Sequence, residues 1–149
     1  MEKLCVIRMR SVIRASGKAK RIVKALGLNR QYSCVIMDKS PSMEGALSVI
    51  SNLITYGEIN NDTLKVLLAR RSFVSSSKKY AWEADKLDSF VSDFASGKRD
   101  VSELGIKRVF HLHPPRGGFE RKGKKTPFSL NGGHGYRGEK INEMLLKML

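Results

Sequence analysis

The segment from His113 to Gly138 carries the residue types that contact nucleic acid. Residues 114–138 hold seven glycines, three prolines, six basic side chains and three aromatic ones. Glycine lets a backbone approach another surface closely, basic side chains neutralise phosphates, and aromatic rings stack on bases or anchor the segment to its own domain. A solvated linker is the alternative, although a structureless loop of this length is uncommon in a compact domain unless it has a function. We predict RNA contact by Arg116, Gly117, Gly118, Phe119, Arg121, Lys122, Lys124, Lys125 and Arg137.

A second group of basic residues lies near the start of the chain, where residues 3–37 contain no acidic residue. In the helix expected after Ser16, the charges fall opposite an apolar stripe, a position in which charges are often simply solvated. A window of one sign nevertheless favours a surface for a polyanion. We predict phosphate contact by Arg8, Arg10, Arg14, Lys18, Lys20, Arg21, Lys24 and Arg30.

The histidines form no convincing catalytic or metal site. His111 and His113 are two residues apart in an expected strand, so they share a face and could begin a metal site with His134. No carboxylate or free cysteine stands near them to complete a ligand set. The glycine-rich turn at residues 132–135 lacks the Lys-Ser/Thr pair and the preceding strand of a phosphate-binding loop. We expect no enzyme, no metal and no cofactor.

The first 59 residues are expected to form a strand, a helix, a strand, a helix and a strand. Strands are expected at residues 4–8, 33–38 and 53–59. Ser16 and Ser40 are suitable N-caps for the two helices, Pro41 suits the first helical position, and Gly27 suits the end of the first helix. Residues 1–59 are expected to form a unit of their own.

The rest of the chain, residues 60–149, is expected to be an extension made mostly of helices. Apolar spacing predicts a helix that begins at residues 60–62 and runs through Arg70, a second around residues 87–94, and a third at residues 139–148. Residues 106–113 alternate like a strand. The basic segment 114–138 shows no periodicity.

The overall charge agrees with this division. The chain has 149 residues, with 28 Lys and Arg against 14 Asp and Glu, a net charge of +14. Residues 1–59 carry +6, residues 60–104 carry +1, and residues 105–149 carry +7. Two basic blocks on either side of a neutral middle favour a polyanionic partner: nucleic acid, an anionic membrane surface or an acidic protein.

Several classes of protein are disfavoured by the composition. No apolar run reaches the length of a membrane span, and the start lacks the features of a signal peptide. Cys5 and Cys34 lie in apolar runs, as buried reduced thiols do, and two cysteines form no disulfide framework. We expect a cytoplasmic protein.

Several stretches resemble one known family. Residues 24–30, the strand 34–37 and the stretch 40–59 resemble the universal "L-thirty" family of large-subunit ribosomal proteins, called "L-seven" in eukaryotes. Residues 110–119 and 135–139 are similar to hallmarks of its long archaeal and eukaryotic branch. The chain starts without the long basic tail of the eukaryotic members, so the archaeal type fits best. Ala46 replaces a methionine common in the family, and residues 120–125 are more basic than its pattern.

The resemblance implies a fold, a function and a set of contacts. The fold would be α+β, with a ferredoxin-like β-α-β-α-β core, a three-stranded, largely antiparallel sheet with both helices on one face, and a helical C-terminal extension. The function would be that of a structural protein of the large ribosomal subunit, present there as a monomer. It would bind the large rRNA near the 5S rRNA and contact neighbouring ribosomal proteins, and no membrane or DNA partner is implied. The RNA-facing positions of the family correspond to Arg8, Arg10, Arg14, Lys18, Arg30, Arg116, Gly117, Gly118, Phe119 and Arg137.

Two other classes of function stay open on the sequence. One is an enzyme that acts on phosphorylated substrates through the glycine-rich segment and the three histidines. The other is a protein-interaction module whose basic blocks bind acidic partners.

Overall fold

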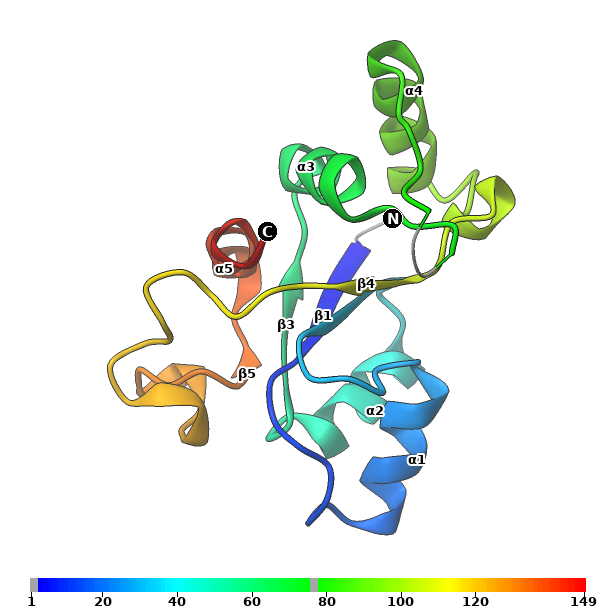
Figure 1. Ribbon diagram of the computed structural model, residues 1–149. Coiled ribbons are helices and arrows are strands. Elements are labelled where there is room, and N and C mark those ends of the chain that lie inside the picture. The colour runs from blue at the N-terminus through cyan, green and yellow to red at the C-terminus, as the bar shows by residue number, and fades with distance from the viewer. Residues whose placement is uncertain (1–2, 76–77) are drawn as a thin grey trace.

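The computed structural model describes residues 3–75 and 78–149, which form one five-stranded sheet with helices on both faces (Figure 1). The strands are β1 (Lys3–Arg8), β2 (Ser33–Asp38), β3 (Ile54–Glu58), β4 (Val109–His111) and β5 (Gly135–Tyr136). The α-helices are α1 (Gly17–Ala25), α2 (Pro41–Ile50), α3 (Asn61–Arg71), α4 (Ala84–Ala95) and α5 (Ile141–Met148). Four 3₁₀ turns complete the described elements: η1 (Val101–Leu104), η2 (Gly123–Lys125), η3 (Phe128–Leu130) and η4 (Gly138–Lys140).

The sheet has the order β4-β2-β1-β3-β5, so the expectation of three strands is wrong for the whole sheet. The central three strands are antiparallel, with Val6 of β1 opposite Val35 of β2 and Tyr56 of β3. The extension adds β4 antiparallel to β2 and β5 parallel to β3. β4 lies within the strand expected at residues 106–113, whereas β5 has two residues, too few for an alternating pattern to identify. They satisfy backbone groups that would otherwise lie open along the edges of the core.

Helices α1 and α2 cover one face of the sheet, and local sequence determines where each begins. The Ser16 hydroxyl accepts a hydrogen bond from the backbone N–H of Ala19, and Ser40 accepts one from Met43. Their apolar side chains pack on Leu4 and other residues of the same face of β1. The expected α+β class and the expected pair of helices on one face are thus confirmed.

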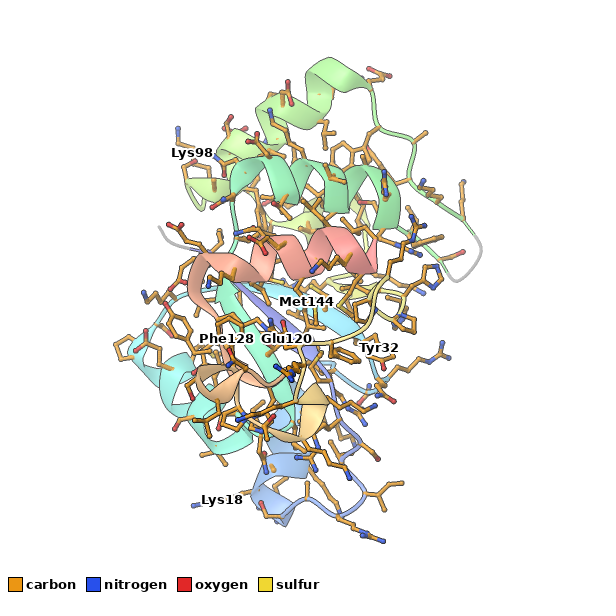
Figure 2. All side chains as sticks on the ribbon, turned by 90° about the vertical axis from the view of Figure 1, so that its left-hand side faces the viewer. Lys18, Tyr32, Lys98, Glu120, Phe128 and Met144 are labelled. Carbon is orange, nitrogen blue, oxygen red and sulfur yellow. The ribbon has the colours of Figure 1, made fainter. Side chains whose placement is uncertain are left out.

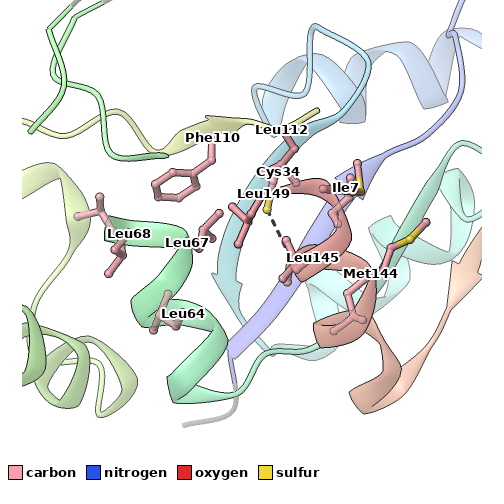
Figure 3. Close-up of a cluster of buried hydrophobic side chains, with 14 of the residues drawn as sticks. Ile7, Cys34, Leu64, Leu67, Leu68, Phe110, Leu112, Met144, Leu145 and Leu149 are labelled. Atoms are coloured by element: carbon pink, nitrogen blue, oxygen red, sulfur yellow. Dashed lines mark hydrogen bonds between the residues drawn. The ribbon is translucent and has the colours of Figure 1, made fainter. Parts of the chain in front are cut away.

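The opposite face is covered by α3 and α5, with α4 packed on α3, and the extension supplies all three helices. Alternate residues of β1 point to the two faces, and Cys5 and Ile7 belong to the core on this side. Figure 3 shows Leu67 of α3, Phe110 of β4 and Leu145 of α5 converging in this core. Because both faces are covered, β1 is buried along its whole length and reads as a continuous apolar run.

The two cysteines lie in this core as free thiols. Cys5 and Cys34 are both fully buried, with their Sγ atoms 3.3 Å apart. The hydrogen bond with Cys34, followed by burial, raises the pKa of the Cys5 thiol well above its ordinary value. The expectation of buried, reduced cysteines is confirmed.

Helix α4 stands away from the sheet at the top of Figure 1 and packs on α3. A row of tilted and stacked rings, Tyr80, Trp82, Phe90 and Phe94, joins it to the rest of the molecule. None of the helices formed by the described residues combines the length and apolar character needed to span a lipid bilayer.

Candidate nucleic-acid interface

The two ends of the central sheet differ in charge. At one end β1 finishes at Arg8, β2 begins at Ser33 and β3 begins at Ile54, with Arg8 opposite Ile54. We call this the basic end, because the two segments that meet the sheet there, the loop of residues 9–16 and the turn of residues 27–32, belong to the first basic block. At the other end Lys3 pairs with Asp38 at 2.6 Å.

The first basic block lies on the loop 9–16, on α1 and on the turn that follows. The loop is fixed to the sheet because the backbone N–H groups of Met9 and Arg10 both donate to the carbonyl of Leu53. Its tip carries Ile13, whose side chain is 80% exposed. Arg14, Lys18, Lys20, Arg21, Lys24 and Arg30 are exposed and Arg10 is partly exposed.

Arg8 lies behind this surface. Only 7% of the residue is exposed, and burial lowers the pKa of its guanidinium. Its Nε donates to the carbonyl of Arg10 at 3.0 Å and its Nη1 to the carbonyl of Leu28 at 2.9 Å. These hydrogen bonds make Arg8 a residue that links the loop to the turn, and its side chain is buried behind the surface.

The glycine-rich segment 114–138 is folded on itself rather than structureless. It contains η2 and η3, and Gly132 and Gly133 are buried inside it. A Cβ atom at Gly132 would lie 2.0 Å from the carbonyl oxygen of Thr126, so a larger residue does not fit there. Part of the glycine content thus serves close internal packing, while Gly117 and Gly118 remain exposed.

Arg137 is the centre of this segment. Only 6% of the residue is exposed; its Nε donates to Thr55 Oγ1 at 2.8 Å and its Nη2 to the carbonyl of Gly133 at 2.9 Å. Both terminal nitrogens donate to the Glu120 carboxylate, and the guanidinium lies 4.5 Å from the centre of the Phe128 ring. Figure 2 shows Glu120 and Phe128 beside each other, between α5 and Lys18 of α1.

The Glu120–Arg137 pair is a bidentate buried ion pair, and the sequence analysis missed it. Burial raises the pKa of Glu120, but the hydrogen bonds and charge of Arg137 outweigh that effect and leave the pKa below its ordinary value. The structure thus gives Arg137, like Arg8, a positioning role behind the surface. The signal available in the sequence was a lone acid, Glu120, in a run of basic residues.

Phe119 joins the segment to the basic end of the sheet. Its ring stacks on Tyr32, with centroids 6.4 Å apart and an interplanar angle of 22°. Tyr32 lies just before β2, in the left-handed region with φ of 63°. On the other side, the backbone N–H of Arg116 donates to the carbonyl of Lys147 at the end of α5. Phe119 therefore acts as the anchor of the segment, one of the two roles that its residue type allows.

The structure brings the exposed parts of both blocks to the basic end, joined through Tyr32 and through Thr55. In the second block, Arg116, Gly117, Gly118, Arg121, Lys122 and Lys125 are exposed, and Phe119 and Lys124 are partly exposed. Across the described ranges, 3–75 and 78–149, none of the exposed basic side chains predicted to contact RNA forms an ion pair with an acidic one, whereas Lys39 and Arg108, outside that set, pair with Glu58 and Asp100. In the middle region, Lys65 pairs with Asp88, Lys86 with Glu83, and Arg99 with Asp93.

This geometry defines a class: a basic α+β protein with a ferredoxin-like core and an unpaired cationic surface at one end of its sheet. The model of the family described as ribosomal protein L30p/L7e matches residues 4–54, from β1 to the start of β3. The chain is 33% identical to large ribosomal subunit protein uL30 of Methanococcus maripaludis, with 97% of each chain covered. It is 36% identical to uL30 of Archaeoglobus fulgidus, covering 96% of this chain and 97% of the relative, and 36% identical to uL30 of Nanoarchaeum equitans over the whole of both.

The chain therefore belongs to the ribosomal protein L30p/L7e family. Similarity to the archaeal proteins continues through the extension, which confirms the resemblance to the long archaeal branch. Members of this family are structural components and not enzymes, so the expectation of a non-enzymatic protein is also confirmed.

Proposed function

We propose that this protein is a structural constituent of the large ribosomal subunit in the cytoplasm and binds the large rRNA through the basic end of its sheet. The observation that carries the proposal is the set of exposed cations on the loop 9–16, α1, the turn 27–32 and the segment 114–138, none of which forms an ion pair with an acidic side chain in the described part of the chain. Unpaired cations gathered on one surface are available to phosphates, and binding then releases condensed counterions.

The residues that contact RNA in this proposal are the exposed ones of both blocks. Arg10, Arg14 and Arg30 come from the loop and turn, and Arg116 and Arg121 from the glycine-rich segment; the lysines of α1 and η2 add to them. Arg8 and Arg137 hold the backbone that carries these side chains. Such a preformed surface suits a folded RNA, whose deep major groove excludes side chains and whose shape is read from outside.

The finer position follows from the long-branch resemblance. In this proposal the protein lies beside the 5S rRNA, and the region of residues 60–104, with its balanced charge, faces neighbouring ribosomal proteins. Cross-linking of assembled subunits, followed by identification of the linked RNA and proteins, tests this placement. Cross-links from α4 to RNA alone would contradict it.

The salt dependence of binding tests the proposed mechanism. If about eight phosphates are neutralised, affinity for deproteinised large-subunit rRNA of Archaeoglobus fulgidus should fall by roughly 10³–10⁵ between 50 and 200 mM salt. Lys18→Gln should make the slope less steep by about one, whereas Lys98→Gln, at the opposite end of the molecule in Figure 2, should leave it unchanged. A slope near zero for the unmodified protein rejects the mechanism.

A further inference from the structure

A cavity of about 510 Å³ lies beside β4, at the margin of the surface described above, with which it shares Arg30. Its walls include Arg30, Arg71, Lys107 and His111, and the lining residues that the structure describes include no acid. Of these four, only Arg30 belongs to the predicted RNA-binding set. Three cations and an imidazole around one cavity, with no acidic side chain among its described lining residues, make a site for an anion.

Three parts of the fold that are distant in sequence meet at this cavity. Gly27 and Arg30 lie in the turn after α1, Arg71 ends α3, and Lys107 and His111 flank β4. The turn approaches β4 so closely that a Cβ atom at Gly27, where φ is +72°, would lie 2.9 Å from a methyl group of Val109. The cavity is therefore built by the close contact of the turn with the edge strand.

Arg71 is held in place and has a donor to spare. Its Nη2 donates to the backbone oxygen of Leu149 at 3.0 Å, which fixes the guanidinium. Its Nε is buried and has no hydrogen-bond partner in the described part of the chain. A buried donor without a partner is unfavourable.

His111 reports the potential inside the cavity. Burial and then the charges of Arg30 and Lys107 lower the pKa of its imidazole. Its Nδ1 lies 3.4 Å from the Ser33 hydroxyl, which orients the ring at the start of β2. The two cations thus both disfavour a positive charge on the ring, and the same positive charges would attract a bound anion.

We propose that this cavity binds a backbone phosphate of RNA, with Arg30, Arg71 and Lys107 as its charge partners and His111 as a further hydrogen-bonding group. The inference rests on the proposed function and extends the RNA-binding surface to the β4 edge. RNA is favoured as the source of the phosphate because Arg30 belongs both to the cavity and to the unpaired cations of the basic end. One RNA strand that crosses the turn of residues 27–32 can therefore meet both.

Lys107 gives the cleanest test because its side chain is exposed, so its loss leaves the core intact. In the full-length protein, Lys107→Gln should make the salt slope for deproteinised large-subunit rRNA of Archaeoglobus fulgidus less steep by about one. Lys98→Gln removes the same charge from an exposed site outside the cavity and should leave the slope unchanged. Equal slopes for the two variants would overturn the proposal.

A second measurement separates RNA phosphate from free phosphate. The imidazole of His111 is titrated by NMR in three samples: the protein alone, the protein with a short single-stranded oligoribonucleotide, and the protein with inorganic phosphate at the same phosphate concentration. The oligoribonucleotide should raise the pKa of His111 more than inorganic phosphate does. No change with either ligand, or an equal change with both, would overturn the assignment to RNA.

The two proposals fail in different ways. If the unmodified protein shows no salt-dependent affinity for rRNA, the proposed function itself is wrong. If it binds steeply, and Lys18→Gln lowers the slope while Lys107→Gln does not, then only the cavity proposal is wrong.

Discussion

Replacing Arg137 by methionine removes a buried guanidinium and keeps much of its apolar volume. The side chain loses hydrogen bonds to Thr55, Gly133 and Glu120, together with its contact on the Phe128 ring. Breaking a buried ion pair by removing one partner costs about 3–5 kcal/mol. The Glu120 side chain is 28% exposed and regains some water, so we expect a loss of about 3 kcal/mol.

The matched control is Arg121→Met, which makes the same chemical change at an exposed position of the same segment. Urea unfolding should show a change within about 0.5 kcal/mol for this variant. Its salt slope for rRNA should nevertheless become less steep by about one, because Arg121 is proposed to contact phosphate directly. Limited proteolysis should cut the segment 114–138 faster in Arg137→Met than in Arg121→Met, since of these two side chains only that of Arg137 is bonded inside the segment.

The pair of variants thus separates positioning from contact. The reasoning is refuted if Arg137→Met is as stable and as protease-resistant as the unmodified protein while its salt slope falls as that of Arg121→Met does. That result would make Arg137 a contact residue whose burial is incidental.

Three further predictions follow from the buried groups and the turns. The pKa of Glu120 lies below its ordinary value of 4.5, so its carboxylate stabilises the fold above that pH, and this contribution is lost as the pH falls through the folded-state pKa. The unfolding free energy of Glu120→Gln should therefore decrease less in acid than that of the unmodified protein. Identical pH profiles for the two proteins would contradict this. Arg8→Met should cost about 2–3 kcal/mol in urea unfolding, because it leaves buried carbonyls without donors, and a change under about 0.5 kcal/mol would contradict its positioning role. Gly27→Ala should lower the melting temperature and reduce the unfolding free energy by about 1–2 kcal/mol, because φ is +72° and the added methyl group meets β4. The control is Gly17→Ala, whose methyl group meets nothing within 4 Å and which should be neutral or stabilising. Equal shifts in melting temperature for the two variants would argue against the close approach of Gly27 to β4.

The core of the fold was predictable because its signals are local. Ser16 and Ser40 mark the starts of α1 and α2, and both cap their helices as expected. The apolar runs of β1 and β2 likewise lie where the sequence placed them, with β2 at Ser33–Asp38. These features depend on residues within a few positions of one another, which periodicity and capping rules can detect.

The edges of the sheet were less predictable because they depend on distant contacts. The strand expected at residues 106–113 is limited to Val109–His111, where β2 offers a partner, and β5 exists only through its pairing with β3. Charge alone also could not separate buried from exposed arginines. Arg8 and Arg137 share the residue type of Arg14 and Arg121, and only the carbonyls and the carboxylate brought by the fold distinguish them.

The cavity beside β4 illustrates the same limit. Arg71 and Lys107 lie outside the two sets of residues that the sequence predicted to contact RNA. Their meeting with Arg30 requires the turn after α1, the end of α3 and β4 to come together. No spacing rule along the chain connects these three places.

Lysine reactivity in assembled large subunits tests the central claim most directly. The protein is acetylated free and within subunits isolated from cells that express it, and the modified lysines are quantified by mass spectrometry. The account predicts that Lys18, Lys20 and Lys125, which are exposed in the free protein, become protected from acetylation in the subunit. Lys86 and Lys98 should keep most of their reactivity. Where neighbouring proteins cover these two lysines, digestion of the RNA with nuclease should not change their reactivity. If Lys18, Lys20 and Lys125 react in the subunit as fast as they do in the free protein, the basic end does not face RNA and the account is contradicted.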